Sequence, residues 1–340
     1  MASDRMGKAC VEDFIAPVSF TYDTVLAWSS AAAQLRTKGG SSVPGDLEAF
    51  TCNICGARNR FTPEAVGRDN ASCTSCRSSM RFRSVALVLS RALFGMDLQL
   101  RDFPNLKSLR GLGISDSDIY SAQLEKCFSY TNTYYHREPV FDLLNPDEGE
   151  FNKFDFVICS DVLEHIPHPV DQAFTTLSAL LKDAGVLILT VPYTLEANTI
   201  EHFDNVMESA VVDMNGKLLV VTRRASGGAY QVSENVVFHG GQGSTQEMRV
   251  FSQPDLERHL VAAGLREFHF ETKGNRSFGI VLSAEGSVPI VASKSEFCVG
   301  RSAIRELVEQ INKHREILRA VRKSRLLRFG GTLGLGPKIP

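Results

Sequence analysis

The stretch from Phe154 to Pro192 contains a complete strand, helix, strand unit, and it constrains the fold more than any other part of the sequence. Phe154–Cys159 is a nearly continuous apolar run, typical of a strand buried on both faces of a sheet. Pro167 and Pro169 then precede a helical apolar face, and Gly185–Val191 is a second apolar strand. Two such strands joined by a helix form a right-handed parallel crossover, so the sequence predicts an α/β protein.

A polar segment, Ser160 to His165, follows the first of these strands. Ligands of parallel sheets bind beyond the carboxyl ends of the strands. We therefore expect Asp161 and His165 to border a ligand. The alternative is that the polar residues of this segment only cap and solvate a loop.

Four of the eight cysteines have the spacing of a metal site. Two Cys-x2-Cys pairs are separated by 17 residues, and two such pairs converge tetrahedrally on Zn²⁺. We predict a structural zinc ribbon at residues 50–80, because four thiolates leave no open position for substrate or water. A redox role for the two pairs is the alternative. The predicted ligands are Cys52, Cys55, Cys73 and Cys76.

Basic residues outnumber acidic ones in and just after the predicted ribbon. Its arginines are Arg58, Arg60, Arg68, Arg77, Arg81 and Arg83, against only Glu64 and Asp69. One hypothesis is contact with nucleic-acid phosphates, and the other is a solvated face that packs on the next domain. A helix is expected at Met80–Phe94, with an apolar stripe that docks onto the main domain.

Composition narrows the class of protein. With 340 residues and 43% hydrophobic content, the chain can bury a large core, and we expect one principal domain with appendages. A formal net charge of -2 argues against a surface built throughout for nucleic acid. The first residues lack the apolar core of a signal peptide and no run has the length of a membrane span, so we expect a cytoplasmic protein.

A second strand-to-helix junction lies at Leu106–Ser117, LKSLRGLGISDS. An apolar strand is followed by Gly111, Gly113 and a turn of small residues, and a helix is expected at Ile119–Cys127. A loop that approaches a ligand needs residues without bulk, so that the backbone and the helix amino end can face the ligand. We interpret the junction as a candidate cofactor loop, although the pattern alone is close to that of an ordinary turn.

These segments together resemble class I S-adenosylmethionine-dependent methyltransferases, in particular type 11-like bacterial members with an N-terminal zinc ribbon. The run FDFVICSDVLEHIPHP followed by LLKDAGVLILTVPY looks like the fourth and fifth strand region of that family, and the resemblance extends from Leu106 to Ala284. It implies S-adenosylmethionine as cofactor and a Rossmann-like seven-stranded sheet of order 3-2-1-4-5-7-6. The antiparallel edge pair would be Leu265–Thr272 and Phe278–Ala284.

The resemblance also implies a set of cofactor-binding residues. The loop of the family reads acid-h-G-x-G-x-G, and in this chain Gly111 stands at the acid while Ser115 and Ser117 stand at the later glycines. Asn132 stands near the ribose-binding carboxylate and bonds more weakly than a charge, whereas Asp142 follows the third strand at the adenine-contacting position. The implied residues are Gly111, Gly113, Ser115, Asp116, Asn132, Asp142 and Asp161.

Residues 193–250 interrupt the α/β pattern and are expected to form a substrate cap. Alternating segments at Ala210–Met214 and Lys217–Thr222 flank Asn215-Gly216, which predicts a hairpin over the active site. Polar residues around the hairpin suggest substrate contact, although each histidine taken singly is more typical of local hydrogen bonding. The candidate bases are His202, His239 and His165, and the candidate substrate-binding residues are Glu201, Glu247 and Arg249.

A long basic helix is expected at residues 299–328, with Ile304, Leu307, Ile311, Leu318 and Val321 along one side. We expect it to pack on the core, to pair with a partner helix in a homo-oligomer, or to lie on an anionic membrane surface. The expected organisation is an N-terminal extension and linker at 1–49, the zinc ribbon at 50–80, a methyltransferase domain at 81–290 that includes the cap, this helix, and a flexible tail at 329–340.

The favoured function is methyl transfer from S-adenosylmethionine to an oxygen or nitrogen of a small-molecule or glycan acceptor. For a hydroxyl acceptor, a histidine of the cap would act as base. An RNA methyltransferase that contacts RNA through its zinc ribbon is one alternative. A non-catalytic binding protein is another, because the cofactor loop lacks the acid and the later glycines of the family.

Overall fold

The structure is a computed structural model that describes residues 48–61, 67–203, 206–215, 217–224, 230–233, 238–239, 245–283 and 287–323. The chain divides into two compact units, Met1–Glu48 and Ala49–Pro340, and the description below concerns the second. The N-terminal extension and linker up to residue 47 and the tail at 329–340 lie outside the described residues.

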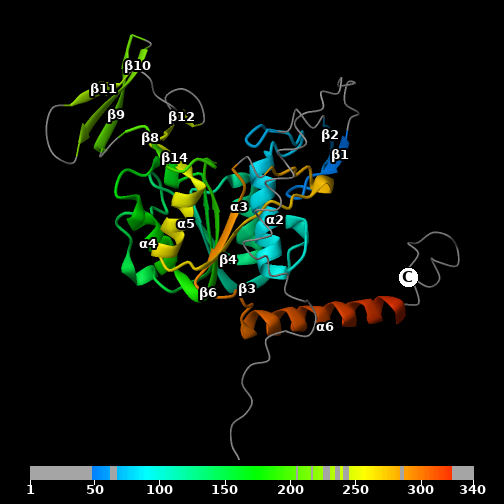
Figure 1. Ribbon diagram of the computed structural model, residues 1–340. Helices are drawn as coiled ribbons and strands as arrows, with labels where there is room; N and C mark the ends of the chain where they lie inside the picture. The colour runs from blue at the N-terminus through cyan, green and yellow to red at the C-terminus, as the bar shows by residue number, and fades with distance from the viewer. Residues whose placement is uncertain are drawn as a thin grey trace, which may run out of the picture. The chain divides into compact units, whose positions relative to one another are not determined.

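A six-stranded, mostly parallel sheet forms the centre of the second unit (Figure 1). Its spatial order is β15-β16-β6-β5-β3-β4, in which β4, β3, β5 and β6 pair in parallel, while β16 pairs antiparallel with both β6 and β15. The strands are Leu106–Ile114 (β3), Phe128–Thr133 (β4), Phe154–Ser160 (β5), Leu181–Thr190 (β6), Glu267–Phe270 (β15) and Ile290–Ser293 (β16).

Helices cover both faces of the sheet (Figure 1). On β5, Phe156 and Ile158 join the core shared with α2 and α3, whereas Val157 and Cys159 join the core shared with α4 and α5. The alternation follows from the two-residue period of a strand, and it explains why the apolar run is continuous. The helices are Met80–Phe94 (α2), Asp118–Cys127 (α3), Val170–Leu180 (α4) and Gln253–Ala262 (α5), and the short 3₁₀ turns are Leu100–Asp102 (η3), Glu148–Glu150 (η4), Leu163–His165 (η5) and Arg276–Phe278 (η6).

One predicted strand is wrong. The segment expected as the last strand, Phe278–Ala284, begins at the last residue of η6, and its described residues make one bridge, between Asn275 and Ile280, while the last strand of the sheet is β16. Gly279 has φ 66, a left-handed conformation that ends η6 and breaks the extended chain. Short apolar runs do not by themselves show which one enters a sheet. Strand β16 also crosses the expected domain end at residue 290.

The expected seven-stranded order is not confirmed. Beyond β4, where the resemblance implies a third strand, the described residues show one parallel bridge, between Tyr134 and Val140. The backbone amide of Tyr134 donates to the Pro139 carbonyl, so the chain turns back within a few residues. The described sheet therefore ends at β4.

The segment inserted after β6 contains short strand pairs, which are antiparallel except for the parallel pair of β14 (Arg249–Ser252) and β7 (Tyr193–Thr194). Strand β14 lies between β7 and β8 (Ile200–Glu201). The predicted hairpin is confirmed, because Met214 pairs with Lys217 and Asn215 between them has φ 58. The further strands are Val206–Met214 (β9), Lys217–Arg224 (β10), Gln231–Ser233 (β11), Phe238–His239 (β12) and Thr245–Gln246 (β13).

The unit begins with a two-stranded ribbon and ends with a long helix. Strands β1 (Glu48–Thr51) and β2 (Arg58–Phe61) form the ribbon, and α6 spans Arg301–Lys323. Within the part of the chain that the structure describes, none of the helices combines the length and the apolar character of a membrane span.

Candidate functional site

The carboxyl edge of the parallel strands is the candidate site. Two residues there have the left-handed conformation, Ser115 after β3 with φ 58 and Asp161 after β5 with φ 53. Ser115 thus keeps a backbone conformation that glycine adopts more easily, and its amide donates to the Thr133 carbonyl at 2.7 Å. Ser115 therefore has a backbone conformation typical of glycine at the position where the resemblance places a glycine.

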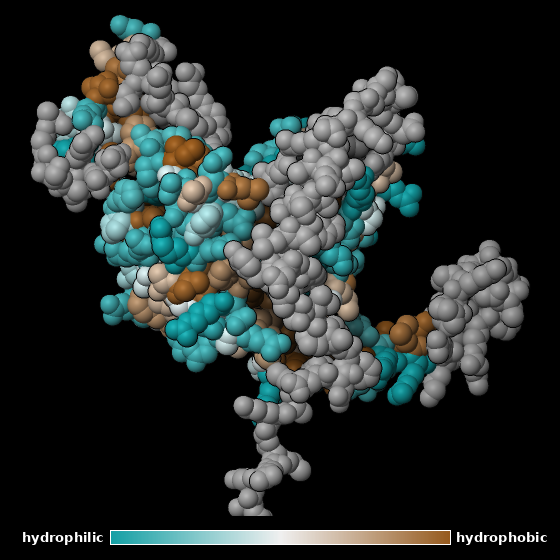
Figure 2. Space-filling model, viewed as in Figure 1, coloured by the Kyte–Doolittle hydropathy of each residue, from teal (hydrophilic) through white to brown (hydrophobic). Residues whose placement is uncertain are grey.

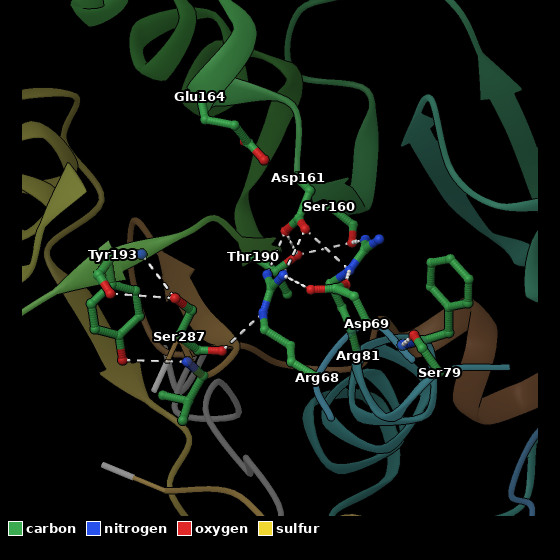
Figure 3. A network of polar contacts seen from close by, with 12 residues as sticks. Arg68, Asp69, Ser79, Arg81, Ser160, Asp161, Glu164, Thr190, Tyr193 and Ser287 are labelled. Carbon is green, nitrogen blue, oxygen red and sulfur yellow. Dashed lines mark hydrogen bonds and ion pairs between the residues drawn. The ribbon is translucent and has the colours of Figure 1, made fainter. Parts of the chain in front are cut away.

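Asp161 is held by two arginines that precede or begin α2 (Figure 3). Arg68 forms a two-pronged ion pair with its carboxylate, at 2.8 and 2.6 Å. Arg81 lies 3.1 Å from the same carboxylate and donates to the Ser160 hydroxyl at 2.8 Å. Thr190, the last residue of β6, donates to Asp161 at 2.8 Å. The ribbon region therefore covers the end of β5.

The network balances its own charges. Asp69 accepts from Arg68 at 2.7 Å and from Arg81 at 2.6 Å, so two guanidinium groups face two carboxylates. Burial would raise the pKa of Asp161, but the hydrogen bond and charge of Arg68, with the charge of Arg81, outweigh burial and lower this pKa. Asp161 is accordingly an ionised partner of arginines.

The candidate cofactor loop is packed with side chains of the chain itself. A Cβ added to Gly113 would meet the Tyr130 hydroxyl and would lie 2.6 Å from Asp116 Oδ2 and 2.8 Å from Asn132 Oδ1. The buried Asp116 carboxylate accepts hydrogen bonds from Tyr120, at 2.7 Å, and from Tyr130. Burial raises the pKa of Asp116 to about 7, although the two tyrosine hydroxyls oppose this.

Asn132 and Asp142 also have local partners. Asn132 accepts from the Asp116 amide at 2.9 Å, and its own amide donates to the Asp116 carbonyl at 2.8 Å. Asp142 accepts from the Leu144 amide and from Asn145, both at 2.8 Å. Asn132 thus stabilises the loop after β3, and Asp142 stabilises a turn.

In this arrangement, side chains of the chain itself occupy the edge at which S-adenosylmethionine is expected to bind. The cavity beside Arg68, Arg81 and Thr190 has a volume of ≈ 110 Å³. Binding sites for small molecules such as S-adenosylmethionine enclose roughly 300–1,000 Å³, so this cavity is too small to hold the cofactor. The space beside Gly113 is taken by Tyr130, and the Asp161 carboxylate is taken by arginines. A cofactor at this edge requires side chains to move.

The inserted segment brings a second group of polar residues together. Arg249, which is 0% exposed, donates to Glu201 at 2.8 Å and to the carbonyls of Leu163 and Ile166 in the loop after β5. Glu201 also lies 3.3 Å from His168 Nε2. Arg249 therefore ties the inserted segment to the loop that starts at Asp161.

Two of the three candidate histidines belong to this group. His202 Nε2 lies 2.9 Å from the buried Glu247 carboxylate. His165 Nδ1 lies 2.7 Å from the Gln246 carbonyl, and its Nε2 lies 3.8 Å from Glu164 Oε1. The backbone of His239 is in β12, but its side chain lies outside the described residues.

The four cysteines come together as the spacing predicts. Their sulfur atoms lie within 4.8 Å of one another, with Cys52 to Cys76 at 3.7 Å and Cys55 to Cys73 at 3.6 Å. The Gly56 amide donates to Cys52 O and the Arg77 amide to Cys73 O, so each Cys-x2-Cys pair forms a tight turn. The donor set and its compactness fit a tetrahedral metal ion.

The arginines of the ribbon region divide into two groups. Arg68 and Arg81 bind Asp161, and Arg83 is 0% exposed and donates to the carbonyls of Ser78 and Gly279. The exposed members are Arg58, Arg60 and Arg77. Three of the six arginines thus bind other parts of the protein and do not add to a free positive surface.

Sequence reasoning missed the roles of Arg68, Arg81, Thr190 and His168 at the two polar groups. Arg68 and Asp161 are 93 residues apart, and no local pattern links them. Thr190 was the one accessible signal, because it ends the strand next to β5 at the same carboxyl edge.

Residues 106–266 match a family model described as a methyltransferase domain. The matched segment runs from β3 to the residue before β15 and includes both candidate loops and the inserted segment. The match supports a methyltransferase enzyme. Among curated proteins, none matches the chain.

Three solved structures illustrate the likeness. A S-adenosylmethionine-dependent methyltransferase from Clostridium acetobutylicum is 14% identical, covering 62% of this chain and 91% of that chain at a TM-score of 0.37. A sugar N-methyltransferase from Streptoalloteichus sp is 13% identical, with 76% and 99% covered and a TM-score of 0.37. An amino pentose methyltransferase from Micromonospora echinaspora is 16% identical, with 64% and 92% covered and a TM-score of 0.35. Likeness of this size does not indicate what the present chain acts on.

Proposed function

We propose, on the premise that residues 106–266 form a methyltransferase domain, that the chain transfers a methyl group from S-adenosylmethionine to an oxygen or nitrogen of a small-molecule or glycan acceptor. One observation carries the proposal. The matched segment contains β3 and β5, which are neighbouring parallel strands, and a candidate ligand loop follows each of them. Loops after neighbouring parallel strands meet at one edge, where ligands of such sheets bind.

The cofactor site of this proposal is closed in the arrangement described. Arg68 and Arg81 hold Asp161, and binding of S-adenosylmethionine at the edge follows release of that contact. The proposed cofactor-binding residues remain Gly111, Gly113, Ser115, Asp116, Asn132, Asp142 and Asp161. Of these, Gly111, Gly113 and Ser115 contribute backbone at the end of β3.

The inserted segment is the proposed acceptor site. Glu201 offers a partly exposed carboxylate to the hydroxyl or amino groups of an acceptor, while the buried Arg249 and Glu247 position Glu201 and His202. Since a carboxylate accepts hydrogen bonds, Glu247 selects the His202 tautomer with its proton on Nε2, which leaves Nδ1 to take a proton from a hydroxyl acceptor. His202 is the proposed base, with His239 and His165 as the other candidates.

Calorimetric titration of the full chain with S-adenosylmethionine tests the cofactor. We expect saturable binding of S-adenosylmethionine at one site per chain, whether or not an acceptor is present. Absence of binding at millimolar cofactor would contradict the proposal. A His202→Gln variant should keep cofactor affinity and lose turnover on a hydroxyl acceptor by about 10²-fold or more, as loss of a general base does.

A second candidate function is a non-catalytic binding protein. The observation that favours it is the packing of Tyr130, Asp116 and Asn132 into the space beside Gly113. The same titration separates the two functions, because the second predicts a folded chain without affinity for S-adenosylmethionine. An RNA methyltransferase is the weaker alternative, since Arg81 and Arg68 are engaged by Asp161.

We also propose that Cys52, Cys55, Cys73 and Cys76 hold one structural Zn²⁺. Two neighbouring side chains support the sulfur atoms: Ser78 Oγ lies 3.3 Å from Cys52 Sγ, and Asn59 Nδ2 lies 3.6 Å from Cys73 Sγ. Metal analysis of protein purified without chelator should find about one zinc per chain. Cys76→Ser should lower both zinc content and thermal stability, whereas Cys298→Ser, at an exposed cysteine outside the cluster, should change neither.

A further inference from the structure

Helix α6 contacts the sheet through its first three turns. Ala303 is 0% exposed, and the Glu306 carboxylate accepts from the amides of Lys107 and Ser108, each at 3.2 Å. Gln310 donates to the Asn105 carbonyl. After Gln310, every residue from Ile311 to Ala320 is exposed. The second half of the helix is thus without cover from the described part of the chain.

An apolar stripe runs along this helix. Ile304, Val308, Ile311 and Leu318 are 42%, 49%, 41% and 55% exposed. They are spaced by four, three and seven residues, which places them on one helical face. Figure 2 shows apolar side chains gathered on the projecting part of the helix. Exposed apolar residues aligned on one face call for a partner surface.

Basic residues border the stripe on one side. At 3.6 residues per turn, Arg301, Arg305 and Arg319 fall along one edge of the apolar face, and Arg315 lies just inside that edge, between the directions of Ile304 and Val308. The acids Glu309 and Glu316 lie beyond these arginines and are turned away from the apolar face. The helix as a whole has seven basic residues and three acidic ones. The partner surface is therefore expected to be negatively charged as well as apolar.

A second copy of the helix fits this pattern poorly. A seam made of Ile304, Leu307, Ile311 and Leu318 would continue through His314, a polar residue that is exposed here. Arg315 beside the seam would find no acidic residue on the corresponding border of an identical helix, and flanking charges decide such pairing. Arginines on the border of a lipid-facing stripe, in contrast, extend their stems over apolar surface and their charges to phosphates.

We propose that α6 binds an anionic lipid surface, lying in its plane with Ile304, Val308, Ile311 and Leu318 in the boundary between headgroups and acyl chains. Arg301, Arg305, Arg315 and Arg319 contact lipid phosphates. The helix meets the two requirements for reversible surface binding, an apolar face and adjacent positive charge. The body of the protein is carried beside the surface through the Ala303 and Glu306 contacts with β3.

Vesicle flotation of the full chain tests the proposal. The protein should float with vesicles of phosphatidylcholine containing phosphatidylserine and remain unbound with phosphatidylcholine alone, and binding should weaken as salt rises. Arg315→Gln with Arg319→Gln should reduce the partition coefficient by roughly 30-fold, from the usual contribution of each basic residue near such a surface. Ile311→Glu with Leu318→Glu should abolish flotation.

The matched control is Lys313→Gln, which removes one positive charge from the opposite side of the same exposed turns. It should float nearly as well as the parent, whereas Arg315→Gln alone should bind several-fold more weakly. Equal losses in the two variants would overturn the proposed orientation. Failure to float with anionic vesicles would overturn the proposal. So would a dimer in sedimentation that Leu318→Glu dissociates, because the stripe would then be a contact between copies.

Discussion

Asp116 and Asp161 follow neighbouring strands at the same edge of the sheet, yet their environments are opposite. Asp161 faces two guanidinium groups, which lower its pKa against the effect of burial. Asp116 faces two tyrosine hydroxyls, and burial raises its pKa to about 7. The contribution of Asp161 to stability is present above the pKa of the unfolded chain and is lost as the pH falls through its folded value. The contribution of Asp116 to stability depends on pH in the opposite direction: it is lost as the pH rises.

The stabilisation linked to Asp116 should disappear between about pH 4 and pH 7. Below about pH 4 the folded and unfolded chains both hold the proton, and up to about pH 7 only the folded chain holds it. The full difference is on the order of 4 kcal/mol. We expect Asp116→Asn, which is neutral at every pH, to remove this decline in urea unfolding measured from pH 4 to 8. Glu148→Gln, at an exposed carboxylate, should leave the pH profile of the parent.

Substitution of Gly113 should destabilise the fold before it tests any ligand. The new Cβ of Gly113→Ala would overlap the Tyr130 hydroxyl, and overpacking of this kind costs about 1–3 kcal/mol. Urea unfolding in the absence of S-adenosylmethionine should show the loss, and Tyr130→Phe in the same chain should restore part of it. Stability equal to that of the parent would mean that the loop opens readily, in favour of a cofactor site there.

At the scale of elements, α2 links the ribbon to the sheet. The helix begins at Ser79, whose hydroxyl accepts from the Phe82 amide, and ends at Gly95 with φ 67. Both signals are local, and the predicted bounds Met80–Phe94 are confirmed. The polar residues of its first turns have long-range partners. Arg81 turns to Asp161, and Arg83 turns to Gly279 O at 3.0 Å.

Arg83 should be essential to this link although it is a charged residue. Arg83→Met leaves the carbonyls of Ser78 and Gly279 without their charged donor, at a cost of about 3 kcal/mol. Thermal and urea unfolding of the zinc-loaded protein measure this loss. The exposed Arg58→Met serves as the control and should unfold like the parent. Similar stability of both variants would show that water or other side chains replace Arg83.

At the scale of the whole molecule, Arg68 and Arg81 occupy Asp161 at the edge where the cofactor is proposed to bind. A conformation closed by a partly exposed ion pair has to open before a ligand enters, and its population reduces the apparent affinity. The network is also charge-balanced, so no ligand is needed to neutralise it. We therefore expect the ribbon region to influence ligand binding at this edge.

Opening this contact should strengthen cofactor binding. We expect Arg68→Ala with Arg81→Ala to lower the Kd for S-adenosylmethionine by about fivefold, which corresponds to about 1 kcal/mol for the ion pair. Calorimetry measures the affinity, and Arg60→Ala, at an exposed arginine, provides the control. Weaker binding in the double variant, with unchanged thermal stability, would instead show that the two arginines contact the cofactor.

Much of the fold follows from local sequence patterns. The apolar runs of β5 and β6, the caps of α2, the Asn215 turn and the spacing of the four cysteines each depend on residues close together in the chain. Backbone propensity and side-chain period act over a few residues, so these elements can be predicted. The misplaced strand at Phe278–Ala284 marks the limit, because several apolar runs can compete for the same sheet edge.

The sequence by itself determined an α/β chain with a cysteine cluster ahead of it, a hairpin insertion and an amphipathic basic helix. Only the tertiary structure decided the partner of each charged group: arginines for Asp161, tyrosines for Asp116, and backbone carbonyls for Arg83. The physical reason is that charges act through space over a few ångströms, whatever their separation along the chain. Arg68 and Asp161 meet because α2 packs on the face of the sheet that β5 and β6 share, which no pattern in either segment contains.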